Sequence, residues 1–232
     1  MRRLVIDCAT EACSVALFDA SGALLGGDLA MLGRGHAERL VPMIAALPGS
    51  GRATTIAVDC GPGSFTGIRV GLAAARALAL AWDATIEGFE SCALVSAMAR
   101  AARPGFGNNE AIDVAMTGGH GEWFCQRFDG AGTALGPVTA YRPEYAVMHL
   151  TAPLVAGSQA SALVAARGSG TALPLWPDAR AINALPVGAL SPNPRPAYGR
   201  APDARLPVQR DDMPAQRDDM PAQPDDMRAQ PA

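Results

Sequence analysis

The pattern of hydrophobic and polar positions over the first hundred residues predicts three short strands followed by alternating helices and strands. Short apolar runs indicate the strands, and a turn at 19–22 joins the second and third strands as a hairpin. Apolar residues that recur every three to four positions indicate the helices. The predicted strands are 4–8, 13–18, 23–29, 55–59 and 84–87, and the predicted helices are 36–47, 65–82 and 91–101.

A shorter version of the same pattern follows in the second half of the chain. Alternating runs at 111–116 and 122–128 predict two paired strands joined by the turn at 118–121, and a strand, turn and helix follow over 154–166. The pattern therefore predicts a second lobe that is a reduced copy of the first. The predicted domains are an N-terminal lobe over 1–102, a C-terminal lobe over 103–205 and a tail over 206–232.

The end of the chain is a low-complexity repeat. The sequence Gln-Arg-Asp-Asp-Met-Pro-Ala occurs at 209–215 and again at 216–222, and a variant of it occupies 223–229. One methionine per repeat is too little apolar surface to build a core or a coiled-coil seam. We expect the tail to be disordered.

Charge narrows the functional classes. The 232 residues include 19 arginines, no lysine and 22 acidic residues, which gives a formal net charge of −3. The last 24 residues carry all of this excess, because they hold three arginines and six aspartates. A protein that grips a phosphate backbone unaided usually has a basic excess. We therefore expect contact with nucleic acid only through a partner.

Cysteine usage and hydropathy indicate the compartment. The five cysteines, an odd number without a C-x-x-C pair, lie mostly in apolar runs, which is typical of free buried thiols. The clustered Cys and His spacing of a metal site is absent. No apolar run approaches 18 residues, and Asp7 falls where a signal peptide would need apolar residues. We expect a soluble cytoplasmic protein without a metal site or a membrane segment.

A glycine-rich turn between the predicted strand at 55–59 and the helix at 65–82 is the most distinctive segment. Its sequence, Asp-Cys-Gly-Pro-Gly-Ser-Phe-Thr-Gly, lets the backbone approach another group closely. Known fingerprints do not match it: Gly67 is one residue late for a dinucleotide loop, a P-loop lysine is missing, and Pro62 and Thr66 replace the glycines of a nucleophile elbow. A tight turn with Ser64 or Thr66 as the helix N-cap is the alternative to an anion site.

Three segments in the same order carry a resemblance to a known family. Residues 4–17, 36–44 and 61–80 resemble the bacterial TsaB (YeaZ) family, the smaller relatives of TsaD in the biosynthesis of tRNA N6-threonylcarbamoyladenosine (t6A37). A weaker match at 194–203 resembles the C-terminal end of the family. The resemblance implies an α/β fold of the actin-like ATPase type (ASKHA, ribonuclease-H-like) with two lobes.

The resemblance also implies a function. Proteins of this kind are non-catalytic subunits that bind and support TsaD, so a TsaD heterodimer, a TsaE-like ATPase in the assembly and a homodimer in isolation are expected. Contact with tRNA would run through the complex, as would any ATP or ADP with Mg²⁺, with no cofactor held by this chain alone. Two alternatives remain: a small actin-like ATPase or phosphotransferase, and a peptidase of the glycoprotease-like family, for which a nucleophile–base set is missing.

Two places in the sequence correspond to the phosphate-binding hairpins of actin-like ATPases. The first follows Asp7, although an aspartate that caps the turn after its strand is the alternative. The second departs from the family, since Thr117 and Gly119 stand where an aspartate and an arginine are usual, and residues 88–95 lack the metal-binding histidines of TsaD. The predicted nucleotide or phosphate loop comprises Asp7, Thr10, Gly61, Gly63, Ser64 and Thr66.

The predicted partner interface lies on the helices at 36–47 and 65–82, through which TsaB-like proteins pair. Small residues recur every four positions on the second helix and would admit close approach of another helix. Burial of this stripe against the protein's own sheet is the alternative. The predicted interface residues are Leu40, Ile44, Leu47, Gly67, Ile68, Gly71, Leu72, Ala75 and Ala79.

Overall fold

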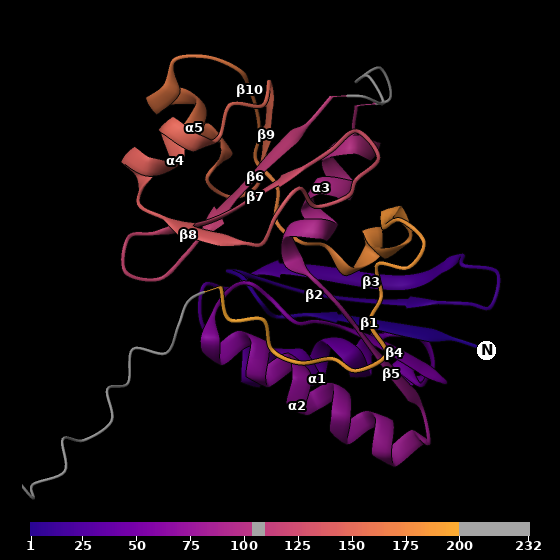
Figure 1. The fold of residues 1–232 in the computed structure, drawn as a ribbon. Helices are drawn as coiled ribbons and strands as arrows, with labels where there is room; N and C mark the ends of the chain where they lie inside the picture. Colours follow the sequence, from indigo (N-terminus) through magenta and orange to yellow (C-terminus); the bar gives the residue numbers. More distant parts are fainter. Residues whose placement is uncertain (104–109, 200–232) are drawn as a thin grey trace, which may run out of the picture. The chain divides into compact units, whose positions relative to one another are not determined.

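The computed structural model describes residues 1–103 and 110–199, so the predicted tail lies outside the described residues. Residues 1–201 form one compact unit, and the described part of it contains two five-stranded sheets (Figure 1). Each predicted lobe contributes one sheet. The domain boundaries proposed from the sequence stay predictions, because both sheets belong to the same compact unit.

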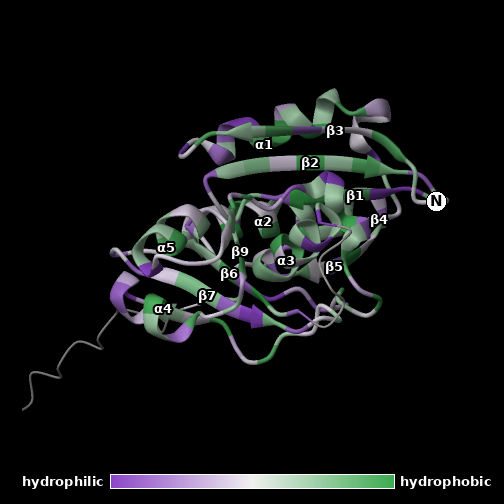
Figure 2. Ribbon diagram, turned by 90° about the horizontal axis from the view of Figure 1, so that it is seen from above, coloured by the Kyte–Doolittle hydropathy of each residue, from purple (hydrophilic) through white to green (hydrophobic). Residues whose placement is uncertain are grey.

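The first sheet has the strand order β3-β2-β1-β4-β5. Its first three strands pair antiparallel, and β4 and β5 extend the sheet parallel to β1. Figure 2 shows hydrophobic residues along most of β2, which is buried over its whole length. The strands are β1 Arg3–Asp7, β2 Ala12–Phe18, β3 Leu24–Met31, β4 Thr55–Asp59 and β5 Thr85–Phe89.

Helices cover both faces of the first sheet. On one face, α1 and α2 bury Leu40 and Ile68 in a common core with the strands. On the other face, α3 and the short 3₁₀ helix η2 bury Leu94 and Ile182. The helices are α1 His36–Ala46, α2 Phe65–Trp82, α3 Ser91–Ala101 and η2 Ala179–Ala184, and the 3₁₀ helix η1 Pro48–Gly51 follows α1.

The second sheet repeats the topology of the first. Its order is β10-β9-β6-β7-β8, with β6, β7 and β8 antiparallel and with β9 and β10 parallel to β6. Two short helices, α4 and α5, cover one face, and α3 packs on the other. The elements are β6 Ile112–Thr117, β7 Trp123–Phe128, β8 Thr139–Tyr141, α4 Pro143–His149, β9 Leu154–Ala156, α5 Ala160–Arg167 and β10 Thr171–Leu173.

The structure confirms the predicted order of elements and the reduced second lobe. In the N-terminal half, β4, α2 and α3 have the predicted bounds, and the other elements begin or end within one or two residues of them. By length and composition alone α2 could also cross a membrane, so the expected absence of a membrane segment stays a prediction. Core helices of soluble proteins pass the same test, and the inner side of α2 belongs to the first core.

Candidate functional site

Two buried aspartates end neighbouring parallel strands of the first sheet. Asp7 ends β1 and Asp59 ends β4, and both side chains are removed from solvent. The Asp7 carboxylate accepts a hydrogen bond from the backbone N–H of Ala9 at 2.9 Å, and the Asp59 carboxylate accepts one from the N–H of Gly61 at 2.7 Å. Each aspartate therefore caps the turn after its own strand, as the alternative interpretation of Asp7 predicts.

Burial determines the charge state of this pair. Loss of hydration raises the pKa of Asp7 to about 7, although the hydrogen bond from Ala9 opposes that rise. Burial also raises the pKa of Asp59 well above its usual range, and the neighbouring Asp7 charge adds to the effect. The hydroxyl of Ser91 donates to Asp59 at 2.9 Å. Both carboxyl groups are therefore harder to ionise than an ordinary aspartate.

The C-terminal part of the described chain packs beside Asp7. The N–H of Ala179 in η2 donates to the hydroxyl oxygen of Ser14 at 2.9 Å, and the Ser14 hydroxyl in turn lies 3.5 Å from the Asp7 carboxylate. Ala179 and Ile182 fill the adjacent apolar surface. Asp7 is fully buried in this arrangement.

The glycine-rich turn packs against the chain's own backbone. The N–H of Ser64 donates to the carbonyl of Ala9 at 2.6 Å. A Cβ added at Gly63 would lie 1.9 Å from that same carbonyl oxygen, and one added at Gly67 would lie 2.0 Å from the carbonyl oxygen of Cys8. These two glycines are therefore required by close approach of the loops after β1 and β4.

Asp7, Thr10, Gly61 and Ser64 of the predicted phosphate loop have partners within the chain. Ser64 is the N-cap of α2, and its hydroxyl accepts from the N–H of Gly67 at 3.2 Å. The Thr10 hydroxyl accepts from the N–H of Ala12 at 3.2 Å. Gly61 donates to Asp59, as described above, and only Ser64 and Thr66 among the six residues have exposed side chains. The arrangement lends no support to a phosphate cradle, which stays a prediction.

In the second lobe, the corresponding hairpin begins at the uncharged residue Thr117, the last residue of β6. The Thr117 N–H donates to the Ser158 hydroxyl oxygen at 2.8 Å, and the Gln159 side-chain amide donates to the Thr117 hydroxyl at 3.0 Å. Gly119 has open space where a side chain would lie. Where the family usually has an aspartate and an arginine, this chain therefore has neutral hydrogen bonds around Thr117 and no side chain at Gly119.

The small-residue stripe of α2 faces the protein's own sheet. A Cβ added at Gly71 would meet the side chains of Cys8 and Val58 at 3.6 Å. These positions therefore lie in the protein's own core, as the alternative interpretation expects, and their use as a partner interface stays a prediction. Leu40, Ile44, Leu47, Gly67, Ile68, Gly71, Leu72 and Ala75 are buried, and Ala79 is partly buried.

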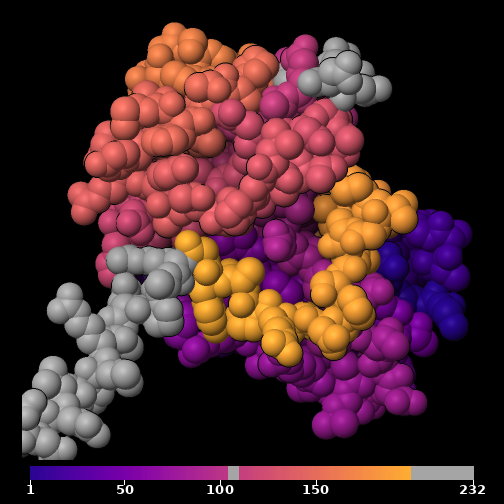
Figure 3. Space-filling model, in the orientation of Figure 1, coloured from indigo at the N-terminus to yellow at the C-terminus, as the bar shows by residue number. Residues whose placement is uncertain are grey.

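The segment from 191 to 199 crosses back over the first lobe. Ser191 and Gly88 exchange two backbone hydrogen bonds of 2.8 Å, which add this segment to the edge of β5. Arg76 on α2 donates to the carbonyl of Pro194 at 3.2 Å, and Arg69 donates to the Tyr198 hydroxyl at 3.0 Å. Figure 3 shows this segment, in orange and yellow, lying across the surface of residues from the first lobe.

Comparison with known proteins identifies the family. A profile of the family described as "TsaD: tRNA N6-adenosine threonylcarbamoyltransferase" matches residues 30–161, more than half of the chain. The tRNA threonylcarbamoyladenosine biosynthesis protein TsaB of Escherichia coli K12 is 41% identical over 93 residues. TsaB of Haemophilus influenzae is 39% identical over 104 residues. The chain belongs to the TsaB (YeaZ) branch of the TsaD-like family.

The extent of these matches differs between sequence and structure. The matched segment covers 38% of this chain and 39% of the E. coli protein, and 43% of this chain and 42% of the H. influenzae protein. YeaZ from Pseudomonas aeruginosa superimposes with a TM-score of 0.64 at 25% identity, over 79% of this chain and 89% of that protein. A second P. aeruginosa structure, described as similar to the peptidase YeaZ, has a TM-score of 0.67 at 24% identity, over 86% and 99% of the two chains. The actin-like, two-lobed fold thus extends well beyond the segment matched in sequence.

In this TsaB-family chain the outward sides of α1 and α2 are also apolar. Val41 on α1 is 61% exposed, and Leu80 on α2 is 88% exposed. Small apolar residues at helical spacing separate the larger ones, and α1 and α2 pack against each other. We call this surface the outer helix face. Its residues are Ala37, Val41, Ala45, Ala73, Ala77 and Leu80.

The sequence pattern did not reveal all of these residues. Asp59 is absent from the predicted site, although two apolar strands that both end in an aspartate are a sequence signal for a buried acid pair. Residues 88–95 offer Glu90 and the buried Cys92, and no cluster of three potential ligands exists within residues 1–103 and 110–199. The five cysteines are buried and unpaired, in agreement with the sequence.

Proposed function

We propose that this chain is a non-catalytic subunit that binds a TsaD protein through the outer helix face and so supports formation of t6A37 on tRNA. The observation that carries the proposal is the exposed apolar side of α2. Of the 18 residues of this helix, only 28% are buried, although its composition is that of a core helix. Apolar surface of this kind is normally covered by a partner.

The proposed interface lies on the outward side of α1 and α2, whereas the residues predicted from the sequence lie on their inward side. The stripe of Gly71 and Ala75 faces inward, whereas Ala73 and Ala77 are exposed and follow the same four-residue spacing. Small residues on the outward side let a partner helix approach closely. Membership in the TsaD-like family supports a TsaD protein as that partner, and the same face would serve a homodimer when TsaD is absent.

A supporting role fits the interior of the first lobe. Asp7 and Asp59 are buried, and the loops that would hold phosphate are closed on each other. We therefore propose that the transfer chemistry belongs to TsaD, with a TsaE-like ATPase in the assembly and ATP or ADP with Mg²⁺ held by the complex. Contact with tRNA would also be made by the complex, in the cytoplasm.

Substitution of exposed residues tests the interface. Leu80→Glu and Val41→Glu should each weaken binding to TsaD by more than about tenfold in calorimetric titration, because a charge would be buried without a counter-ion. Leu135→Glu is the matched control, since Leu135 is 59% exposed on the second lobe. All three variants should melt like the parent. Unchanged TsaD affinity in both helix variants would place the interface elsewhere.

A melting experiment separates this proposal from the ATPase alternative. A chain that holds no nucleotide by itself should have the same melting temperature with and without ATP and Mg²⁺. Binding to the native state stabilises it by mass action, so a concentration-dependent rise would favour an ATPase or a phosphotransferase. Addition of TsaD alone should raise the melting temperature of the parent and leave that of Leu80→Glu unchanged.

A further inference from the structure

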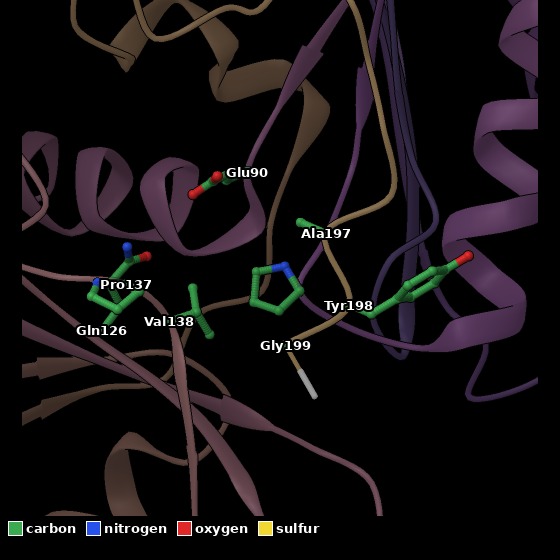
Figure 4. Close-up of a pocket in the computed structure, with 8 residues that line it drawn as sticks. Glu90, Gln126, Pro137, Val138, Ala197, Tyr198 and Gly199 are labelled. Atoms are coloured by element: carbon green, nitrogen blue, oxygen red, sulfur yellow. The ribbon is translucent and has the colours of Figure 1, made fainter. Parts of the chain in front are cut away.

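A cleft of about 510 Å³ opens between residues of the two lobes (Figure 4). The first lobe contributes Pro62 and Glu90, and the second contributes Gln126 on β7. The segment that crosses back over the first lobe closes one side. We call this the Gln126 cleft, and its lining residues are Pro62, Glu90, Gln126, Pro137, Val138, Ala197, Tyr198 and Gly199.

The Gln126 side chain leaves one acceptor unused. Gln126 is only 6% exposed, and its amide nitrogen Nε2 donates to the carbonyl of Gly136 at 3.0 Å. A carbonyl can only accept, so this bond fixes which end of the amide is nitrogen. The oxygen Oε1 is then buried without a hydrogen-bond partner. Buried acceptors of this kind are rare and usually meet a ligand or water.

Glu90 supplies a negative charge to the same cleft. It is the N-cap residue of α3, but its side chain makes no capping bond. Its carboxylate forms no ion pair or hydrogen bond with other residues of the described chain, and it is exposed. Figure 4 shows Glu90 and Gln126 entering the cleft from different elements. Arg195 lines the adjoining cavity, which shares Glu90 with the cleft.

The rest of the lining is apolar or already engaged. Pro62 and Pro137 have no N–H to donate, and Val138 adds a hydrocarbon wall. The Tyr198 hydroxyl is held by Arg69, and in Figure 4 its ring points away from Gln126. The side chains of the cleft therefore offer two acceptors, one of them charged, beside apolar surface.

We propose that the Gln126 cleft binds a small protonated amine. One ammonium N–H donates to Oε1 of Gln126, and the Glu90 carboxylate balances the charge. The hydrocarbon part of the amine packs on Pro137 and Val138. This site is separate from the outer helix face, so the proposal does not depend on the binding of TsaD.

The probe is butylammonium, titrated into the full-length chain alone and followed by calorimetry and ligand-observed NMR. Saturable binding to one site is expected. Tetramethylammonium carries the same charge without an N–H, and 1-butanol carries the same chain without a charge. Both should bind at least about tenfold more weakly, because a charged hydrogen bond is lost. Equal binding of all three probes would overturn the proposal, as would the absence of saturation by butylammonium.

Three variants locate the site. Glu90→Gln changes an exposed residue and should weaken butylammonium binding at least about tenfold while the melting temperature stays the same. Gln126→Met should weaken it as well, and its fold is checked by circular dichroism. Glu144→Gln removes one exposed acid on α4 and should bind like the parent. Parent-like affinity in Glu90→Gln would show that the amine does not use this cleft.

Discussion

The two lobes share one topology but neutralise their buried acids in different ways. In the second lobe, Asp113 on β6 is fully buried and accepts from Arg127 at 2.7 and 3.0 Å and from the N–H of Ala152 at 2.7 Å. In the first lobe, Asp7 and Asp59 are buried side by side, and no arginine pairs with them among the described residues. The second lobe therefore uses a counter-ion where the first depends on protonation.

In each lobe a backbone N–H just before a helix donates to a carbonyl at or just beyond the first strand of the sheet. The N–H of Ser64 donates to Ala9 in the first lobe, and the N–H of Gln159 donates to Ala115 at 3.0 Å in the second. The helix that follows this contact has 18 residues in the first lobe and eight in the second. The two lobes therefore share the hydrogen bond that precedes the helix. Within the described residues, only the first lobe has a long helix with an exposed apolar side.

The largest effect is expected at the loop contact. Gly63→Ala places a Cβ against a backbone oxygen that cannot move without displacing β1, so we expect a loss of more than about 4 kcal/mol in unfolding free energy. Gly119→Ala in the second lobe enters open space and should change it by less than about 0.5 kcal/mol. Urea unfolding measures both. Similar stabilities of the two variants would mean that the first-lobe loops are not closed on each other.

Sequence reasoning predicted the elements well because they depend on local patterns. The helix at 65–82 was recognisable from the glycine turn, the Ser64 cap and a steady supply of alanine and leucine. The side of that helix that faces inward was not, because Gly71 and Ala75 resemble Ala73 and Ala77 in size and polarity. When both sides of a helix are apolar, the sequence pattern predicts the helix but not which side is buried.

The candidate site was harder to predict because it depends on contacts between distant residues. The hydrogen bond from Ala179 to Ser14 and the bridge from Ser191 to Gly88 join residues about a hundred or more positions apart. No local sequence pattern predicts that η2 packs beside Asp7. The departure at Thr117 and Gly119 was visible in the sequence, and the structure shows what replaces the missing charges.

The next largest effect concerns the counter-ion of the second lobe. Arg127→Leu leaves Asp113 buried beside an apolar side chain, so we expect a loss of about 3–5 kcal/mol in unfolding free energy at pH 7. Arg180→Leu is the control, because the pair of Arg180 and Asp178 is more exposed and should contribute about 1 kcal/mol or less. Unfolding in urea is the measurement. Equal losses in the two variants would contradict the contrast between the lobes.

The acid pair of the first lobe should make stability depend on pH. The pKa of Asp7 is higher in the folded chain than its ordinary value of 3.8, so the folded state binds more protons. The stabilisation is complete below about pH 4 and is lost as pH rises through 7, which amounts to roughly 2–3 kcal/mol between pH 5 and pH 8.

Asp59→Asn tests the assignment of this pH dependence. An amide at this position can accept from Gly61 and donate to Asp7, so the loss between pH 5 and pH 8 should fall to less than about half of the parent's. Glu144→Gln, an exposed acid of the second lobe, should keep the parent's pH dependence. If Asp59→Asn has the same pH profile as the parent, the dependence arises elsewhere.

The smallest expected effect is a difference between the lobes in the rate at which a buried cysteine is alkylated. Burial raises the pKa of Cys60 in the first lobe and of Cys125 in the second to about 12, so neither thiol reacts readily while it is covered. Alkylation at pH 8 then requires local opening.

Cys60 lies beneath the segment held by Arg69 and Arg76, whereas Cys125 packs against the short helices α4 and α5. Because each thiol reacts only after its surroundings open, a difference in rate reports opening. We expect iodoacetamide to label Cys125 roughly threefold to tenfold faster than Cys60 in the native chain, and both at the same rate in 8 M urea, as measured by peptide mass spectrometry. Faster labelling of Cys60 would show that the crossing segment opens more readily than the second lobe.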